Sequence, residues 1–294
     1  MELLNYKIYS PEDSSNTASP LFILHGLLGS MDNWRSQAKK LSATQTVITL
    51  DLRNHGNSPH VKGMSYREMY EDVINVAQAE NIQSFHLLGH SMGGKVAMQL
   101  ALAHPDMVES LIVVDIAPKP YPLWHQSMFA AVMSAPIETA SSRQELDEYL
   151  KSAIEDRAER GFMLKNIKRN PKSDSKSDKA NDVGSDNRND ERNEDSNTTK
   201  SSTFSWKPNL KEISRGYLKI AGFTTALAQY SKPTLFIKGG ESPYIQDSDI
   251  ALIESLFPKA TITTLKESAH LPHIQQKNDF FVTVTSFLLP LSKL

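Results

Sequence analysis

The chain alternates short, unbroken runs of apolar residues with longer segments in which apolar residues recur at helical spacing. An unbroken apolar run of four or five residues is typical of a strand buried on both faces of a sheet. The longer segments predict amphipathic helices, and the capping box Ser65-Tyr66-Arg67-Glu68 opens one of them. This order predicts a mostly parallel sheet covered by helices on both faces. Strands are expected at residues 4–8, 20–24, 47–50, 85–88, 110–114, 233–237 and 260–265, and helices at 32–41, 65–80, 247–257 and up to 289.

The alternation stops between residues 118 and 232, where the pattern predicts helices near 123–135, 142–160 and 210–218 and no buried strand. Within this segment, residues 165–203 are nearly all Lys, Asp, Asn, Ser and Arg, a composition that cannot offset its own ordering entropy. We therefore expect a core made of residues 1–117 and 233–294, and a helical cap at 118–232 that contains a disordered polar insertion at 165–203. The cap leaves the sheet after the strand that ends at Asp115, at the carboxyl edge where α/β proteins bind ligands.

The composition excludes several classes of site. The 294 residues include no cysteine, so disulfides, thiolate metal sites and a cysteine nucleophile are ruled out. The formal net charge of −2 gives no electrostatic basis for binding nucleic acid or an anionic membrane. No signal peptide and no apolar run long enough to span a bilayer is visible. We expect a cytoplasmic protein that acts on a small molecule without a metal or cofactor; the sequence gives no indication of its oligomeric state.

The strand-turn-helix context of Gly89-His90-Ser91-Met92-Gly93 makes Ser91 the candidate nucleophile. Glycines flank a strained serine in such a turn because its two arms approach closely. The N–H of Met92 then points toward whatever the serine attacks, at the positive end of the new helix. The glycine-flanked turn after the second strand brings the N–H of Leu27 beside it, which gives two donors for an oxyanion. The alternative is a glycine-rich turn with a surface serine.

A serine hydroxyl is a poor nucleophile unless a base takes its proton. In this architecture the partners follow the serine in the order acid, histidine. Of the nine histidines, that rule favours His270 and His273, both in the loop after the last strand. We expect His270 to be the base because it is closer to the strand end, and a solvated or supporting role for His273.

The acid has two main candidates, Glu241 and Asp115; Asp247 and Asp249 are further alternatives that also suit the polar start of the following helix. The commonest place for it is the loop after the strand at 233–237, where Glu241 and Ser242 stand, but Glu241 is one residue out of phase. Asp115 closes an apolar strand, and a carboxylate there is expensive to bury without partners. We therefore expect Asp115 to orient His270; the alternative is a capping or structural aspartate.

Aromatic residues of the cap and of the first helix are candidates for an acyl pocket. The same apolar stripes are compatible with packing of the cap against the core, so the pattern alone leaves both readings open. The candidates are Trp34, Trp124 and Phe129, together with Met128, Met133, Phe162 and Phe223.

Four motifs in order resemble the α/β-hydrolase superfamily: His25-Gly26, Asp51-x-Arg53-x-His55-Gly56-x-Ser58, Gly89-His90-Ser91-Met92-Gly93-Gly94 and the late His270. Arg53-Asn54-His55-Gly56, Val114-Asp115-Ile116-Ala117-Pro118 and Ser242-Pro243-Tyr244 resemble the narrower subgroup of YbfF-like esterases and abhydrolases. The resemblance implies an α/β-hydrolase fold with Asp115 as the acid and Ser242 supporting it. It also implies hydrolysis of short-to-medium acyl esters, and in some members of acyl-CoA thioesters.

We therefore expect a serine carboxylesterase that forms an acyl-enzyme through Ser91, His270 and Asp115. A carbon–carbon bond hydrolase or an acyltransferase shares the same triad. A non-catalytic ligand-binding homologue is a different class, which labelling of Ser91 by a fluorophosphonate distinguishes. Serine at position 91 argues against dehalogenases and epoxide hydrolases, whose nucleophile is an aspartate.

Overall fold

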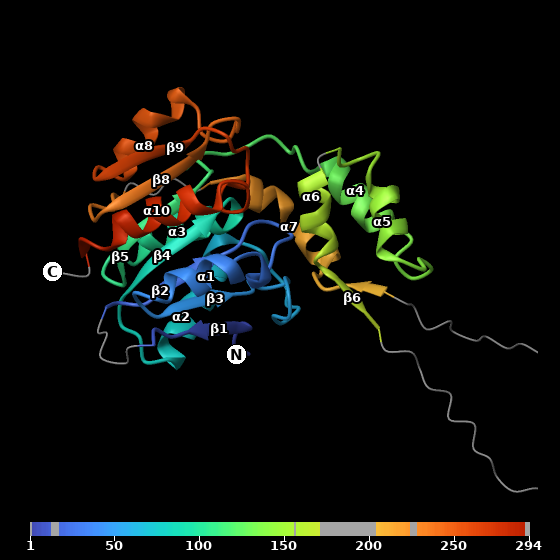
Figure 1. The fold of residues 1–294 in the computed structure, drawn as a ribbon, viewed down its shortest axis with the longest axis horizontal. Coiled ribbons are helices and arrows are strands. Elements are labelled where there is room, and N and C mark those ends of the chain that lie inside the picture. The colour runs from blue at the N-terminus through green and yellow to red at the C-terminus, as the bar shows by residue number, and fades with distance from the viewer. Residues whose placement is uncertain (1, 13–17, 156, 171–203, 224–227, 292–294) are drawn as a thin grey trace, which may run out of the picture.

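A computed structural model describes residues 2–12, 18–155, 157–170, 204–223 and 228–291 (Figure 1). One seven-stranded sheet forms the centre, in the order β1-β3-β2-β4-β5-β8-β9. Strand β1 pairs antiparallel with β3, and the other pairings in this sheet are parallel, so the predicted mostly parallel sheet is confirmed. The strands are β1 (Tyr6–Tyr9), β2 (Leu21–Leu24), β3 (Val47–Leu50), β4 (Phe85–His90), β5 (Val108–Val114), β8 (Thr234–Gly239) and β9 (Ala260–Leu265).

Helices cover both faces of the sheet because successive strand residues point to opposite sides. Leu21 and Ile23 of β2 pack in one apolar cluster, and Phe22 and Leu24 pack in the other. The first cluster lies under α1 (Arg35–Leu41) and α10 (Lys277–Leu288), and the second lies under α2 (Tyr66–Ala79), α3 (Met92–Ala103) and α8 (Ile250–Leu256). The predicted capping box opens α2. Short helical turns complete this part: η1 (Met31–Asn33), η2 (Asp247–Asp249) and α9 (Pro272–Gln275).

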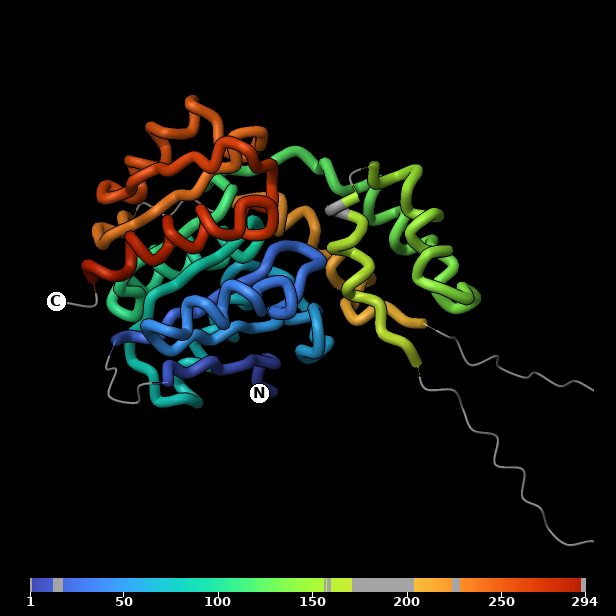
Figure 2. Tube along the Cα trace, viewed as in Figure 1, coloured from blue at the N-terminus to red at the C-terminus, as the bar shows by residue number. Residues whose placement is uncertain are grey.

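Residues 118–232, which we name the cap segment, connect β5 to β8. They form α4 (Gln126–Ser134), α5 (Arg143–Leu150), α6 (Arg157–Leu164) and α7 (Leu210–Ala221). Helices α4, α5 and α6 lie together beside one end of the sheet, and α7 lies between them and the core (Figures 1 and 2). The prediction that this segment is helical and inserted after Asp115 therefore describes most of it.

Two predictions about the cap segment are wrong in detail. The single helix expected at 142–160 is two helices, α5 and α6, because the chain turns after Leu150. The Arg160 guanidinium stabilises that break by donating to the carbonyls of Ile154 (2.7 Å) and Glu155 (2.8 Å). A strand pair that was not expected is also present, in which β6 (Ile167–Arg169) pairs antiparallel with β7 (Phe204–Trp206).

The prediction of a disordered insertion at 165–203 is wrong for residues 165–170, which the structure describes. Asn166 and Ile167 are buried, and the Asn166 side-chain amide donates to the Leu28 carbonyl of the core. The sequence pattern does not indicate that these two residues are buried, because they lie in a stretch rich in lysine and asparagine. The rest of the prediction, residues 171–203, lies outside the described residues. None of the helices in the described ranges has the length and apolar character needed to cross a bilayer.

Lys95 on α3 is a buried ammonium group that joins the core to the cap segment. Its side chain is 2% exposed, and Nζ donates to the carbonyls of Ala221 (3.0 Å) and Gly222 (2.8 Å) at the end of α7. Nζ also lies 4.7 Å from the centroid of the Tyr121 ring. Among the described residues no carboxylate pairs with it, and burial lowers the pKa of Lys95 to about 7.

The pKa of Lys95 predicts a pH-dependent stability. An unfolded lysine holds its proton to about pH 10.4, whereas the folded protein releases it near pH 7, so the unfolded state binds more protons between those values. The free energy of unfolding of the wild type should therefore rise with pH there, relative to Lys95→Met, by up to about 1.4 kcal/mol per pH unit. Urea unfolding of both proteins between pH 6 and pH 10 measures this. Parallel pH dependences of the two proteins would contradict it.

Candidate active site

Ser91 lies in the turn between β4 and α3, in a backbone conformation that non-glycine residues rarely adopt. Its φ and ψ are 53° and −118°, and such conformations cost about 1–3 kcal/mol. A Cβ on Gly89 would lie 2.2 Å from the carbonyl oxygen of Gly93, so only glycine lets the turn close. The predicted strand, turn and helix are present, and the turn places Ser91 at the carboxyl edge of the sheet.

His270 lies in the loop between β9 and α9, beside Ser91. Its Nε2 is 2.9 Å from Ser91 Oγ, and its Nδ1 is 2.8 Å from Asp115 Oδ2. The structure thus brings together three side chains that the sequence singled out from distant parts of the chain. His90, which the order rule set aside as a base, holds this loop instead: its Nε2–H donates to the His270 carbonyl (2.7 Å).

Asp115 is fully buried and directly follows β5, with a φ of 52°. Its Oδ1 accepts from the Gly239 N–H (2.8 Å), and its Oδ2 accepts from Ser242 Oγ as well as from His270. The competing candidate, Glu241, is exposed to solvent. The carboxylate beside the histidine is therefore Asp115, and Ser242 contacts it directly.

The turn after β2 faces the start of α3. Leu27 and Met92 both border a cavity beside Ser91, and the N–H of Met92 has no partner within its helix because it belongs to the first turn. His25 fixes this turn from below: Nε2 accepts from the Leu52 N–H (2.9 Å), so Nδ1–H donates to the Gly26 carbonyl (2.8 Å). Burial lowers the pKa of His25 to about 4, which matches this neutral form with one donor and one acceptor.

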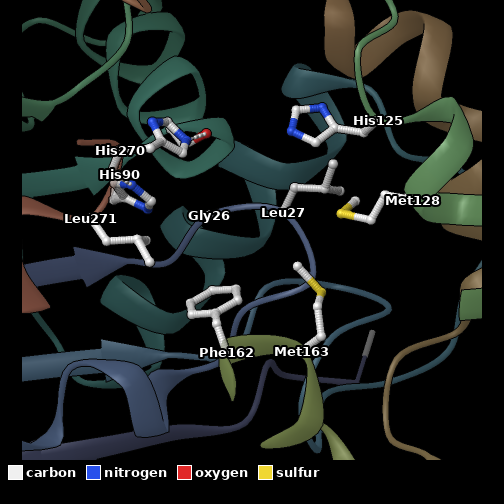
Figure 3. A pocket seen from close by; sticks show the side chains of 10 residues that line it. Gly26, Leu27, His90, His125, Met128, Phe162, Met163, His270 and Leu271 are labelled. Atoms are coloured by element: carbon white, nitrogen blue, oxygen red, sulfur yellow. Dashed lines mark hydrogen bonds between the residues drawn. The ribbon is translucent and has the colours of Figure 1, made fainter. Parts of the chain in front are cut away.

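Two cavities meet at Ser91. Leu27, Ser91 and His125 border both. Figure 3 shows the first cavity, with His270 and His125 on opposite sides and Phe162 and Met163 between them on the cap side. Its other apolar walls are Met128 and Leu271. The second cavity is lined by Lys95, Ile116, Trp124, Tyr217, Ile220 and Tyr244, among others.

The structure corrects part of the predicted pocket. Trp124 lines the second cavity, but Trp34 and Phe129 are not among the residues that line either one. Trp34 is fully buried in the core, where its ring stacks on His273 at 4.1 Å, and Phe129 packs on Tyr217. His273 is therefore buried rather than solvated, and burial lowers its pKa to about 3.

His125, at the start of α4, borders both cavities. Its Nδ1 is 2.9 Å from Tyr217 Oη, and its Nε2 is 3.3 Å from Tyr244 Oη. Burial lowers the pKa of His125 to about 4, so the ring is neutral at pH 7. No local pattern identifies such a residue, because its partners come from α7 and from the loop after β8. In the described ranges, no group of three or more His, Asp or Glu side chains is arranged to hold a metal ion.

Known proteins are similar to this chain in sequence and in fold. The model of the alpha/beta hydrolase fold family matches residues 19–277. The sn-1-specific diacylglycerol lipase ABHD11 of Mus musculus is 35% identical over 288 residues, covering 95% of this chain and 84% of that protein. Esterase YbfF of Escherichia coli K12 is 26% identical over 286 residues, covering 97% and 98%.

A solved structure of a marine microorganism esterase has a TM-score of 0.82 and 35% identity to this chain, and the match covers 98% of this chain and 100% of that one. These two relatives and the solved structure are named as esterases or lipases. Each match covers 84% or more of the matched protein. The chain therefore belongs to the alpha/beta hydrolase fold family, as an enzyme of the esterase/lipase type.

Proposed function

We propose that the protein is a serine carboxylesterase that hydrolyses short-to-medium acyl esters through an acyl-enzyme. The observation that carries the proposal is the unbroken line of hydrogen-bonding distances from Ser91 Oγ through both nitrogens of His270 to Asp115 Oδ2. A nucleophile, a base and an acid that orients the base are the parts that acyl transfer by serine needs.

In the first half of the reaction, Ser91 Oγ attacks the ester carbonyl carbon while His270 Nε2 takes the hydroxyl proton. Asp115 holds the Nδ1–H of His270 and stabilises the imidazolium that forms. The N–H groups of Leu27 and Met92 are the proposed donors to the oxyanion of the tetrahedral intermediate.

In the second half, the intermediate collapses, and His270 gives its proton to the leaving alcohol oxygen. A water molecule then attacks the acyl-enzyme with His270 as its base, and the tetrahedral intermediate releases the carboxylic acid and restores Ser91. A thioester carbonyl can follow the same steps with a thiol as leaving group. One acyl-length series run on p-nitrophenyl esters and on CoA thioesters separates the two substrate classes.

We infer from the position of His270 which cavity holds the alcohol and which holds the acyl chain. The leaving oxygen must receive its proton from Nε2, and His270 and Leu271 line the first cavity, so we place the alcohol there. The acyl chain then extends into the second cavity, past Met92 and Ile116. The cap segment supplies walls of both cavities, so in this proposal it acts as a lid over the reacting ester.

Replacing the nucleophile provides the first test of the proposal. Ser91→Ala should lower kcat on an activated ester by at least about 10³-fold, because no acyl-enzyme can form. The variant should also lose the burst of product and its labelling by a fluorophosphonate. Ser255→Ala, an exposed serine on α8, is the control and should match the wild type. Equal turnover by Ser91→Ala would contradict the proposed nucleophile.

The identity of the acid is tested by ranking three variants. Asp115→Asn should lower kcat by about 10²–10⁴-fold, because an amide no longer stabilises the imidazolium or fixes its tautomer. Ser242→Ala removes one of several donors to Asp115 and should cost about tenfold. Glu241→Gln is the matched control, since its side chain faces solvent. Steady-state kinetics on one ester gives the ranking, and a larger loss in Glu241→Gln would reassign the acid.

The assignment of the cavities predicts two separate changes in selectivity. Ile220→Ala enlarges the second cavity, so the best acyl chain should become longer by one or more carbons, with a gain of about fourfold per added methylene that is buried. Met163→Ala enlarges the first cavity and should alter the preference for the alcohol while leaving the acyl optimum in place. Two ester series, one varied in the acid and one in the alcohol, measure both effects. The opposite pattern would exchange the two cavities.

A further inference from the structure

Tyr244 stacks on the imidazole that lies between Ser91 and Asp115. The ring centroids of Tyr244 and His270 are 3.9 Å apart with an interplanar angle of 20°. Nδ1 and Nε2 of His270 meet their partners at 2.8 Å and 2.9 Å only while the imidazole keeps its present plane. A flat ring lying parallel against one face resists the rotation that would take both nitrogens out of line.

Tyr244 is in turn held by the stretch of the cap segment that leads from β5 to α4. Tyr121 Oη donates to the Tyr244 carbonyl, and the Trp124 ring meets the Tyr244 ring edge-on at 5.4 Å and 78°. His125 Nε2 lies 3.3 Å from the Tyr244 hydroxyl. Three residues within five positions of the chain therefore contact Tyr244, whose ring stacks on His270.

The hydrogen bonds of His125 extend this contact to α7. Tyr217 Oη accepts from the backbone N–H of His125 (3.0 Å) and also lies beside its Nδ1 (2.9 Å). A neutral imidazole has one donor and one acceptor, so in either tautomer it satisfies both tyrosine hydroxyls. The stretch before α4 and helix α7, near the two ends of the cap segment, are thus both linked to His270 through Tyr244.

We propose that Tyr244 is a positioning residue that holds the His270 imidazole in line with Ser91 and Asp115, and that the cap segment acts on the base through it. The inference rests on the proposed function, because it gives His270 the role of base. The ring of Tyr244 orients the His270 imidazole, and the Tyr244 hydroxyl makes the contact with the cap segment. Misplacing a reacting group by about 1 Å costs about 10²-fold in rate, which sets the scale of the expected effect.

The test separates the ring from the hydroxyl. Tyr244→Leu removes the stacked ring and should lower kcat by about 10–100-fold, with KM changed by less than about threefold. Tyr244→Phe keeps the ring and should restore kcat to within about threefold of the wild type, the remainder being the lost contact with His125. The rate at which a small fluorophosphonate labels Ser91 should follow the same order, because that probe does not need the full cavity.

A spectroscopic measurement adds a readout that a general loss of stability would not move. The Nδ1 proton that His270 shares with Asp115 should give a far-downfield proton resonance in the wild type and in Tyr244→Phe. In Tyr244→Leu this resonance should be broadened or absent at a temperature at which the protein is fully folded.

Tyr70→Leu is the matched control, because it also removes a tyrosine ring that contacts a histidine, His104, away from the cavities. It should leave kcat and the labelling rate unchanged. Should Tyr244→Leu fail to fold, Tyr244→Met fills the space without a ring and carries the same expectation. Unchanged kcat in the ringless variant, or a rise in KM alone, would overturn the inference. A wild type that neither hydrolyses esters nor takes the label would overturn the proposed function instead.

Discussion

The burial of one carboxylate organises the carboxyl edge of this sheet. Asp115 is withdrawn completely from solvent, and an ionised group in that position costs several kcal/mol unless hydrogen bonds replace its water. Its donors come from three separate segments: the end of β8 through Gly239, the following turn through Ser242, and the loop after β9 through His270. Satisfying the charge therefore requires β5, β8 and the β9 loop to meet in one arrangement. That arrangement also delivers the imidazole to Ser91.

The histidines around His270 leave that carboxylate without a competing cation. Burial lowers the pKa of His125 to about 4 and of His273 to about 3, and it lowers the pKa of His90 well below its ordinary value. The charge that His270 carries when protonated lowers the pKa of His90, His125 and His273 further. These three neighbours are thus neutral at pH 7. An imidazolium that forms at His270 is then in contact with the Asp115 carboxylate as its charged partner. The proposed base needs this pairing to be stabilised when it is protonated.

Most of the core could be predicted from the sequence because its signals are local. Unbroken apolar runs identify strands buried on both faces, and residues that end parallel strands, such as Asp115, must meet at one edge. The cap segment lacked such signals. Strands of three residues, like β6, are too short to show alternation, and the break between α5 and α6 depends on the contacts of Arg160. The sequence leaves the role of Trp34 open, because an aromatic residue at helical spacing has the same pattern whether it lines a cavity or fills the core.

The division between core and cap segment separates most residues that line the cavities from the residues that fix the catalytic geometry. The proposed catalytic groups depend on the register of parallel strands, whereas Phe162, Met163 and Tyr217 reach the cavities from the cap segment, whose last helix is held by the Lys95 ammonium. Cavity walls on α6 and α7 can change without moving the strand ends. Residues of the stretch from β5 to α4 have less freedom, because they contact both a cavity and the ring stacked on His270. Substrate range and catalytic geometry are therefore separable over most of the cap segment and coupled at His125 and Tyr244.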